Sequence, residues 1–399
     1  MNYKNELKNN VVKNYIFLFI NNLELKQGIW MIYLASKGIT LMQLGILEGI
    51  FHITSFLMEV PTGAIADMYG RKTSRIIGRL FLLISVIIFI FANNFYMFGL
   101  SFIIQAISYN LESGAGEALI YDSLKEINEE NKYIKINGNQ EMIVQIASII
   151  NFALGGYLAS KSYILTFVLG AVFAVCALIQ AFTFCEPKIK KENKNVKNPL
   201  KVMKVQFLEG MKVIKNDKKV LFLILFSEIT AVFSVNLFYY LQNYWKAYNY
   251  TEFKIGIIFS VSSLVAAVIA YYTHKIEKIL KEKGILLIMP IISMLCIWGI
   301  VVTNWSFVFF ILNEVVGTIL FVVLGDYINK LIPSETRATV LSLQSMVFSF
   351  FMIIVFPIVG RIGDMFSLNN AFKMLAISAT ILVVINCYFI LKVYKKEYV

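Results

Sequence analysis

The chain has 399 residues, of which 58% are hydrophobic and only 16% are charged, and its mean hydropathy is +0.69. Soluble domains carry about 25% charged residues, so this composition excludes an ordinary soluble protein and indicates a membrane protein. The formal net charge of +12 would favour a nucleic-acid partner in a soluble protein, but the Lys and Arg residues gather in alternate loops, so we expect no nucleic-acid partner here.

Twelve apolar runs reach the roughly 20 residues that a membrane-spanning helix needs. The first run, from about Val11 to Ala35, is too long for a cleavable signal and is expected to form one membrane helix. Basic residues concentrate at both termini and in the loops after even-numbered runs, which predicts that both termini are cytoplasmic. The runs centre near Ile20, Ser55, Ile84, Ala106, Ile149, Val172, Thr230, Leu264, Met294, Thr318, Ile353 and Ile381.

A short charged turn separates the second run from the third. Its residues Gly63, Asp67, Gly70, Arg71 and Lys72 follow the pattern Gly, three residues, Asp, two residues, Gly, Arg, Lys. Glycines at both ends of the pattern are expected to let two helices meet through a tight turn. This stretch resembles the loop between helices two and three of major facilitator superfamily transporters. A cytoplasmic hairpin without special role is the alternative, because basic turns are common in membrane proteins.

The resemblance implies an all-α membrane protein with the major facilitator superfamily fold, in which 12 transmembrane helices form two six-helix bundles. We expect an N-terminal bundle over residues 1–185, a basic cytoplasmic linker with an amphipathic helix over 186–219, and a C-terminal bundle over 220–399. An internal repeat independently favours two related halves. With an offset of 211 positions, Tyr33, Thr40, Leu44, Gly45 and Ile46 recur as Tyr244, Thr251, Ile255, Gly256 and Ile257.

Two further loops, 113–124 and 327–344, look like the corresponding segments of bacterial twelve-helix drug efflux carriers in the tetracycline and macrolide efflux neighbourhood. Two departures leave the transport direction and the coupling ion open. Residues 151–156 keep the glycine pair of the helix-five pattern of proton antiporters but lack its Gly-Pro. The arginine usual in helix four of those carriers is also missing.

The resemblance further implies that Asp67 and Arg71 belong to a charge cluster that locks the two halves in the outward-facing state. The alternative is that these charges only set the topology. The candidate residues of this cytoplasmic gate and signature loop are Gly63, Asp67, Gly70, Arg71, Lys72, Asp122 and Arg337.

In this architecture, as the resemblance implies, helices one, four, seven and ten line a central cavity. Each carries a carboxylate here, and an ionisable residue inside a membrane is by default a functional candidate. On one continuous helix, Glu24 and Lys26 would point about 200° apart, so we do not expect them to pair locally. The candidate substrate and proton cavity residues are Glu24, Gln105, Tyr109, Glu112, Glu228, Tyr239 and Glu314.

Helix two carries the candidates for a proton path, which are Glu48, His52 and Glu59 at helical spacing. A histidine titrates near neutral pH, which suits proton transfer. His52 could instead be a satisfied packing residue, and Glu59 could extend to the membrane surface.

These observations predict a secondary active transporter that exports small amphiphilic compounds, cationic or zwitterionic, by proton-coupled alternating access. The alternative is an uptake carrier or facilitator for a small nutrient or metabolite. A non-transporting receptor on the same scaffold is a third class.

The expected partners are a small-molecule substrate, protons and the lipid bilayer, and we expect a monomer in the bacterial cytoplasmic membrane. We expect no cofactor, no metal site and no enzyme activity, because the chain lacks a phosphate-binding Gly-Lys-Ser or Gly-Lys-Thr sequence and has only two histidines. A proton gradient would supply the energy.

Overall fold

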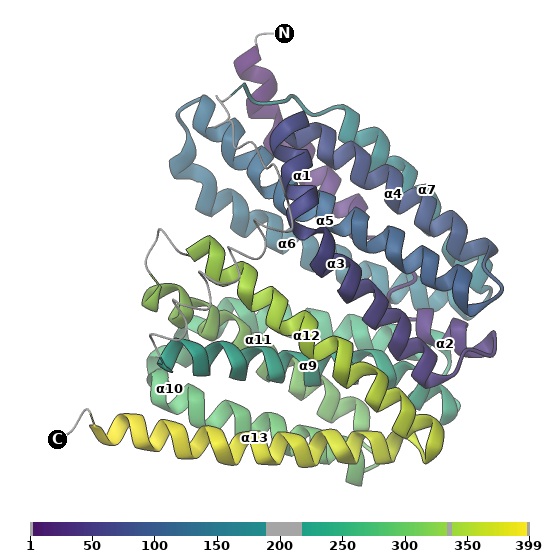
Figure 1. Ribbon diagram of the computed structural model, residues 1–399, viewed down its shortest axis with the longest axis vertical. Coiled ribbons are helices and arrows are strands. Elements are labelled where there is room, and N and C mark those ends of the chain that lie inside the picture. The colour runs from purple at the N-terminus through teal and green to yellow at the C-terminus, as the bar shows by residue number, and fades with distance from the viewer. Residues whose placement is uncertain (1–2, 189–217, 333–336, 397–399) are drawn as a thin grey trace. The chain divides into compact units, whose positions relative to one another are not determined.

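The computed structural model describes residues 3–188, 218–332 and 337–396, whose helices Figure 1 traces. A bilayer core holds no water to satisfy exposed backbone groups, so helices are the expected way for this chain to span it. Most of the predicted linker, including its amphipathic helix, lies outside the described residues. The helices described are α1 Tyr3–Asn21, α2 Trp30–Ser36, α3 Leu41–Tyr69, α4 Arg71–Phe91, α5 Phe95–Glu126, η1 Glu130–Lys132, α6 Tyr133–Ala159, α7 Tyr163–Phe182, α9 Lys218–Ala247, α10 Glu252–Val302, α11 Ser306–Leu331, α12 Arg337–Met365 and α13 Leu368–Lys396.

The long helix α10 accounts for two of the predicted spans. It runs for 51 residues, about 77 Å at 1.5 Å per residue, which is more than twice the roughly 30 Å of a bilayer core. Lys281 interrupts it with a φ of 54°. Nine helices within the described ranges are long and apolar enough to cross a membrane, α10 being counted once. The predicted span centred on Ile20 corresponds to α1 and α2 together, and the predicted span centred on Ala106 corresponds to α5. The predicted all-helical, twelve-span architecture is confirmed.

The first predicted helix is broken, so the prediction of one continuous helix from Val11 to Ala35 is wrong. Helix α1 ends at Asn21, and α2 begins only at Trp30. We call residues 22–29 between them the helix-one break. The Asn22 side chain donates to the Leu18 carbonyl at 2.8 Å, and such side-chain bonds compete with helical backbone bonds.

The helix-one break is held by residues of α6. The Leu25 carbonyl oxygen lies so close to Gly155 that a Cβ built there would be 2.4 Å away, which only glycine tolerates. The Asn151 amide donates to the Gln27 side chain at 3.3 Å. Gly155, the first glycine of the pair in the helix-five pattern, therefore makes room for the unwound chain.

The residues separate into two compact units, and helices α3 and α10 each belong to both. Unit 1 comprises residues 1–39, 47–205 and 251–260, and unit 2 comprises residues 40–46, 206–250 and 261–399. Residues 41–46 of α3 therefore belong to unit 2 and the rest of α3 to unit 1. Residues 252–260 of α10 belong to unit 1 and the rest of α10 to unit 2.

The two glycines of the internal repeat, Gly45 and Gly256, lie in these short first segments of α3 and α10. In unit 2, a Cβ at Gly45 would lie 2.6 Å from the Pro357 Cα. In unit 1, a Cβ at Gly256 would lie 2.4 Å from the Phe152 carbonyl oxygen and 2.9 Å from the Gly156 Cα. Small residues let helix backbones approach closely in a membrane, so the repeat found in the sequence corresponds to two equivalent close crossings.

The N-terminus of α3 is capped within unit 2. The Asp364 carboxylate accepts from the Leu41 and Met42 backbone N–H groups at 2.9 and 2.8 Å. Tyr240 donates to the Leu41 and Phe356 carbonyls nearby. A carboxylate here satisfies amides that the helix leaves unpaired and complements the helix dipole.

Helix α4 packs against α5 and α7 in unit 1 (Figure 1). Its contact with α5 is close, since a Cβ at Gly78 would lie 3.2 Å from the Leu111 Cβ. The hydroxyls of Ser85 and Ser101 exchange hydrogen bonds across the two helices, and Ser74 donates to the Leu111 carbonyl at 2.7 Å. Small residues and hydroxyl bonds are typical of helix interfaces in membranes.

We predict that Gly156→Ala destabilises unit 1, because the new methyl group would lie 2.6 Å from the Glu252 carbonyl oxygen. Overpacking of this kind costs about 1–3 kcal/mol. Thermal unfolding of the purified protein should show a midpoint lowered by a few degrees. Gly138→Ala on the same helix is the control, since nothing lies within 4 Å of its Cβ position. Equal midpoints for the two variants would contradict the close crossing.

Candidate functional site

The signature loop forms a compact charge cluster at the junction of α3 and α4. The Arg71 guanidinium donates to Asp67 at 2.7 Å, and its Nε lies 3.7 Å from the Asp122 carboxylate. Gly70 makes the turn with a φ of 106°, a conformation that favours glycine. Gly63 lies inside α3 with no atom within 4 Å of its Cβ position, so its predicted part in the turn is wrong.

Glu186 is a member of this cluster that the sequence did not reveal. Its carboxylate accepts from the backbone N–H groups of Arg71 and Lys72 at 2.8 and 2.7 Å and so caps the start of α4. It also explains the absence of a side chain at Gly70, where a Cβ would lie 2.7 Å from a Glu186 oxygen. The Glu186 side chain thereby joins the segment after α7 to the signature loop.

Arg75 and Glu112 form a buried ion pair between α4 and α5. The Arg75 guanidinium contacts both Glu112 oxygens, at 2.8 and 3.2 Å, and donates to Asn14 at 2.8 Å. It also lies over the rings of Phe17 and Phe184, 4.2 and 4.6 Å from their centroids. Arg75 is only 1% exposed, although it follows the basic turn of the signature loop by only three residues. Glu112 is therefore a paired carboxylate.

A second buried arginine, Arg79, lies one turn further along α4 and was not found from the sequence. It is 4% exposed and donates to the Asn21 side chain at the end of α1. Both Glu24 and Glu112 act on it electrostatically. The sequence did contain a signal for it, because Arg79 lies within an apolar run and an arginine there needs a partner inside the protein.

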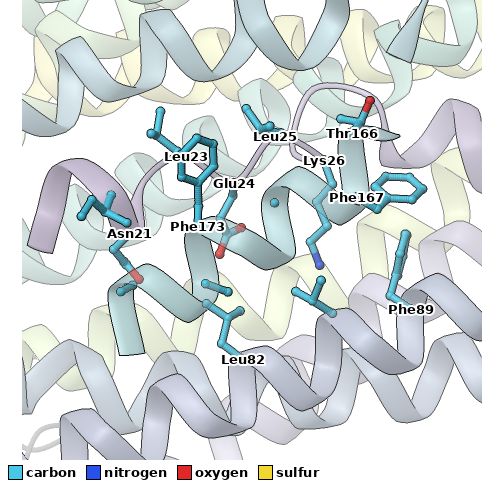
Figure 2. Close-up of a pocket in the computed structure, with 15 residues that line it drawn as sticks. Asn21, Leu23, Glu24, Leu25, Lys26, Leu82, Phe89, Thr166, Phe167 and Phe173 are labelled. Atoms are coloured by element: carbon cyan, nitrogen blue, oxygen red, sulfur yellow. The ribbon is translucent and has the colours of Figure 1, made fainter. Parts of the chain in front are cut away.

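A pocket in unit 1 lies beside the helix-one break, and we call it the break pocket (Figure 2). It is a small cavity of about 30 Å³ between the break, α4 and α7. The Lys26 ammonium donates to Gln105 at 2.9 Å and lies 4.9 Å from the Phe89 ring centroid. Figure 2 shows Glu24 and Lys26 extending to the same side, so the 200° separation expected for a continuous helix is wrong.

The three cavity candidates on α5 have different partners. Gln105 binds Lys26 and Glu112 binds Arg75, whereas Tyr109 is largely exposed and packs edge-on against Phe51 with centroids 6.1 Å apart. These three side chains therefore do not form one common site.

The proton-path candidates of α3 lie in unit 1. The His52 Nε2 is 3.8 Å from a Glu48 oxygen, and both residues are 8% exposed. Glu59 is half-buried and lies ten residues before the end of α3. The structure thus brings two of these three residues together.

The remaining cavity candidates belong to unit 2. Ser227 and Gln344 donate to the Glu228 carboxylate at 2.7 and 2.6 Å, and Gln344 was not singled out from the sequence. Tyr239 packs edge-on against Phe356 with centroids 5.7 Å apart.

Glu314 in α11 is half-buried, and its carboxylate has no hydrogen bond or ion pair with any described residue. Arg337 begins α12, but its side chain lies outside the described part. Among the described ranges, His, Cys, Asp and Glu form no group of three or more that could hold a metal ion.

A sequence model of the Major Facilitator Superfamily matches residues 17–346, which is most of the chain. The chain belongs to the major facilitator superfamily. Members of this superfamily are multi-pass membrane transporters of small molecules and are not enzymes, so the transporter prediction is confirmed at this level.

Relatives and solved structures agree with this assignment. The chain is 26% identical to the MFS-type transporter YxaM of Bacillus subtilis over 367 residues, 88% of each protein. It is 23% identical to the quinolone resistance protein NorA of Staphylococcus aureus over 270 residues, 67% of this chain and 66% of NorA. The crystal structure of the nucleoside transporter NupG matches it with a TM-score of 0.77 at 14% identity, covering 97% of this chain and 99% of NupG.

We predict that Glu112→Gln destabilises this superfamily member by about 3–5 kcal/mol, because removal of one partner leaves the buried Arg75 charge uncompensated. Denaturant unfolding in micelles measures the change in the free energy of unfolding. Glu117→Gln on the exposed side of the same helix should change it by less than about 0.5 kcal/mol. Arg75→Gln with Glu112→Gln should cost less than the sum of the two single changes. Additive effects would contradict the ion pair.

Proposed function

We propose that this transporter exports small amphiphilic compounds, cationic or zwitterionic, from the bacterial cytoplasm in exchange for protons. It works by alternating access as a monomer in the cytoplasmic membrane, with both termini in the cytoplasm. The proton gradient is its only energy source, and it uses no cofactor. One proton that crosses with a membrane potential of 100 mV releases about 2.3 kcal/mol, enough for roughly a 50-fold substrate gradient.

The observation that carries this proposal is the environment of Glu228. Its side chain is 8% exposed on a membrane helix and receives hydrogen bonds from a hydroxyl and an amide. No Lys, Arg or His within the described ranges forms an ion pair with it. A buried anion without a cation is costly, yet these two donors stabilise it, so Glu228 can exist both with and without a proton.

Glu314 supports a second proton-binding position in unit 2, because its carboxylate also lies on a membrane helix and contacts no cation among the described residues. The likeness to NorA, a quinolone resistance protein, supports drug export and antibiotic resistance as the physiological role. The Asp67, Arg71 and Asp122 cluster supplies charges for a cytoplasmic gate.

An uptake carrier or facilitator for a small nutrient or metabolite is the second candidate. The missing Gly-Pro of the helix-five pattern favours it, since the remaining glycines, Gly155 and Gly156, serve close packing in unit 1. The fold shared with the nucleoside transporter NupG is compatible with such a substrate.

The export proposal predicts drug tolerance that depends on the proton gradient. Expression in a pump-deficient bacterium should raise the tolerated concentration of several amphiphilic drugs, and an uncoupler should abolish the gain. Glu228→Gln should lower gradient-driven efflux at least about tenfold, because its amide cannot exchange a proton at neutral pH. Asp67→Asn should lower efflux while the protein remains inserted in the membrane.

The matched control is Asp326→Asn, which changes an exposed carboxylate of unit 2 that pairs only with Lys330 among the described residues. Its efflux should equal that of the unchanged protein. Full gradient-driven efflux by Glu228→Gln would contradict proton coupling at this residue. Accumulation of a labelled nutrient in place of drug efflux would favour the uptake carrier.

A further inference from the structure

We propose that Lys26 is an internal counter-ion that controls proton binding at Glu48, so that the helix-one break and α3 form a proton-binding centre in unit 1. Lys26 acts through Glu48 and is therefore a positioning residue. This inference rests on the proposed function, because it adds a site of proton exchange, and the residue that tunes it, to the same transporter. All the groups involved belong to unit 1.

Lys26 is held in the helix-one break by groups from the surrounding helices. Its ammonium donates to Gln105 of α5 at 2.9 Å and lies 4.9 Å from the Phe89 ring centroid of α4. Two carboxylates act on it electrostatically, Glu24 from the break and Glu48 from α3. Figure 2 shows Glu24 and Lys26 extending to the same side. One ammonium group is therefore shared by two acids.

The ionic groups inside unit 1 alternate in sign from α4 to α3. Each attracts the next, and such a chain lets buried charges compensate one another where the bilayer cannot solvate them. Glu48 lies at one end of the chain, and Lys26 is the one lysine or arginine among the described residues that acts on it. The members of the chain, in order, are Arg75, Glu112, Arg79, Glu24, Lys26 and Glu48.

This position makes Glu48 the carboxylate of the chain that binds a proton most readily. Glu112 contacts Arg75 through both oxygens. Glu24 acts on two cations, whereas Glu48 shares its one lysine with Glu24. A neighbouring cation favours the ionised form of a carboxylate, so the acid with the weakest compensation takes up a proton first. His52 lies 3.8 Å from Glu48, and an imidazole can both accept and donate a proton.

The titratable groups around Glu48 come from three elements. Tyr109 packs against Phe51, whose ring also contacts the His52 ring. Lys26 is the one fixed cation among these groups, so its charge sets how easily Glu48 is protonated. The groups are Lys26 and Glu24 of the break, His52 of α3 and Tyr109 of α5.

Proton binding at Glu48 changes what holds the break. When Glu48 is ionised, Lys26 is attracted both to α3 and to Glu24. When Glu48 is protonated, Glu24 remains as the counter-ion of Lys26, and the attraction between the break and α3 is lost. The break lies between α1 and α2 and lacks their regular backbone bonds, so it is the part of the first span that can respond to this change.

Infrared spectroscopy of the purified, full-length protein in nanodiscs tests the proposal, because a protonated carboxylic acid has its own C=O stretching band. Glu48→Gln should remove one titrating band and so assign it. Lys26→Gln should move the pH midpoint of that band up by at least about one unit, since loss of a nearby cation makes protonation easier. An unchanged midpoint, or the absence of a titrating band that depends on Glu48, overturns the proposal.

Further variants separate tuning from a structural role. Lys26→Arg keeps the charge and should leave the midpoint nearly unchanged. Lys37→Gln changes an exposed lysine of unit 1 and is the matched control, which should not move the midpoint. Lys26→Gln combined with Glu24→Gln keeps the total charge and should show the same upward shift, which provides the test if the single variant does not fold. A purely structural role would lower thermal stability without moving the midpoint and would overturn the assignment.

Transport in cells separates this inference from the proposed function. If gradient-driven drug efflux occurs but Lys26→Gln leaves the Glu48 band unmoved, the tuned proton site is wrong and the export function stands. If the band shifts as expected but the unchanged protein shows no gradient-driven efflux, the proton site stands and the export function is wrong.

Discussion

The structure of unit 1 depends on one constraint, which is that a charge inside a membrane protein must find its partner within the protein. Arg75 meets it through both oxygens of Glu112, the Asn14 side chain and two aromatic faces. These partners come from α1 and α5 and from the segment after α7. The ion pair therefore joins helices that are distant in sequence, and it leaves Gly116 no room for a side chain because of the Arg75 guanidinium.

The same constraint explains why helix one can be broken. Arg79 satisfies Asn21 where α1 ends, and Gln105 satisfies Lys26 within the break. Without these bonds the unwound segment would expose polar groups that the bilayer cannot solvate. Broken helices in transporters are tolerated where they line a cavity, and here the break lines a pocket that contains an acid and a base.

The sequence predicted what depends on local periodicity. Apolar runs located the spans, and helical spacing grouped Glu48 with His52. The family resemblance, not periodicity, placed Asp67 and Arg71 in one charge cluster. The sequence could not predict contacts set by distant segments. The burial of Arg75 could not be predicted, because its partner Glu112 lies 37 positions away on another helix. The helix-one break depends in the same way on Gly155, which belongs to another helix.

The central claim is that residues 22–29 are not helical and form one wall of the break pocket. Backbone carbonyl and Cα chemical shifts of Glu24 and Leu25 test it most directly, by NMR of selectively ¹³C-labelled protein in nanodiscs. We expect non-helical shifts for these residues and helical shifts for Phe17 in α1 and Tyr33 in α2. Helical shifts for Glu24 and Leu25 would show a continuous first helix and contradict the account.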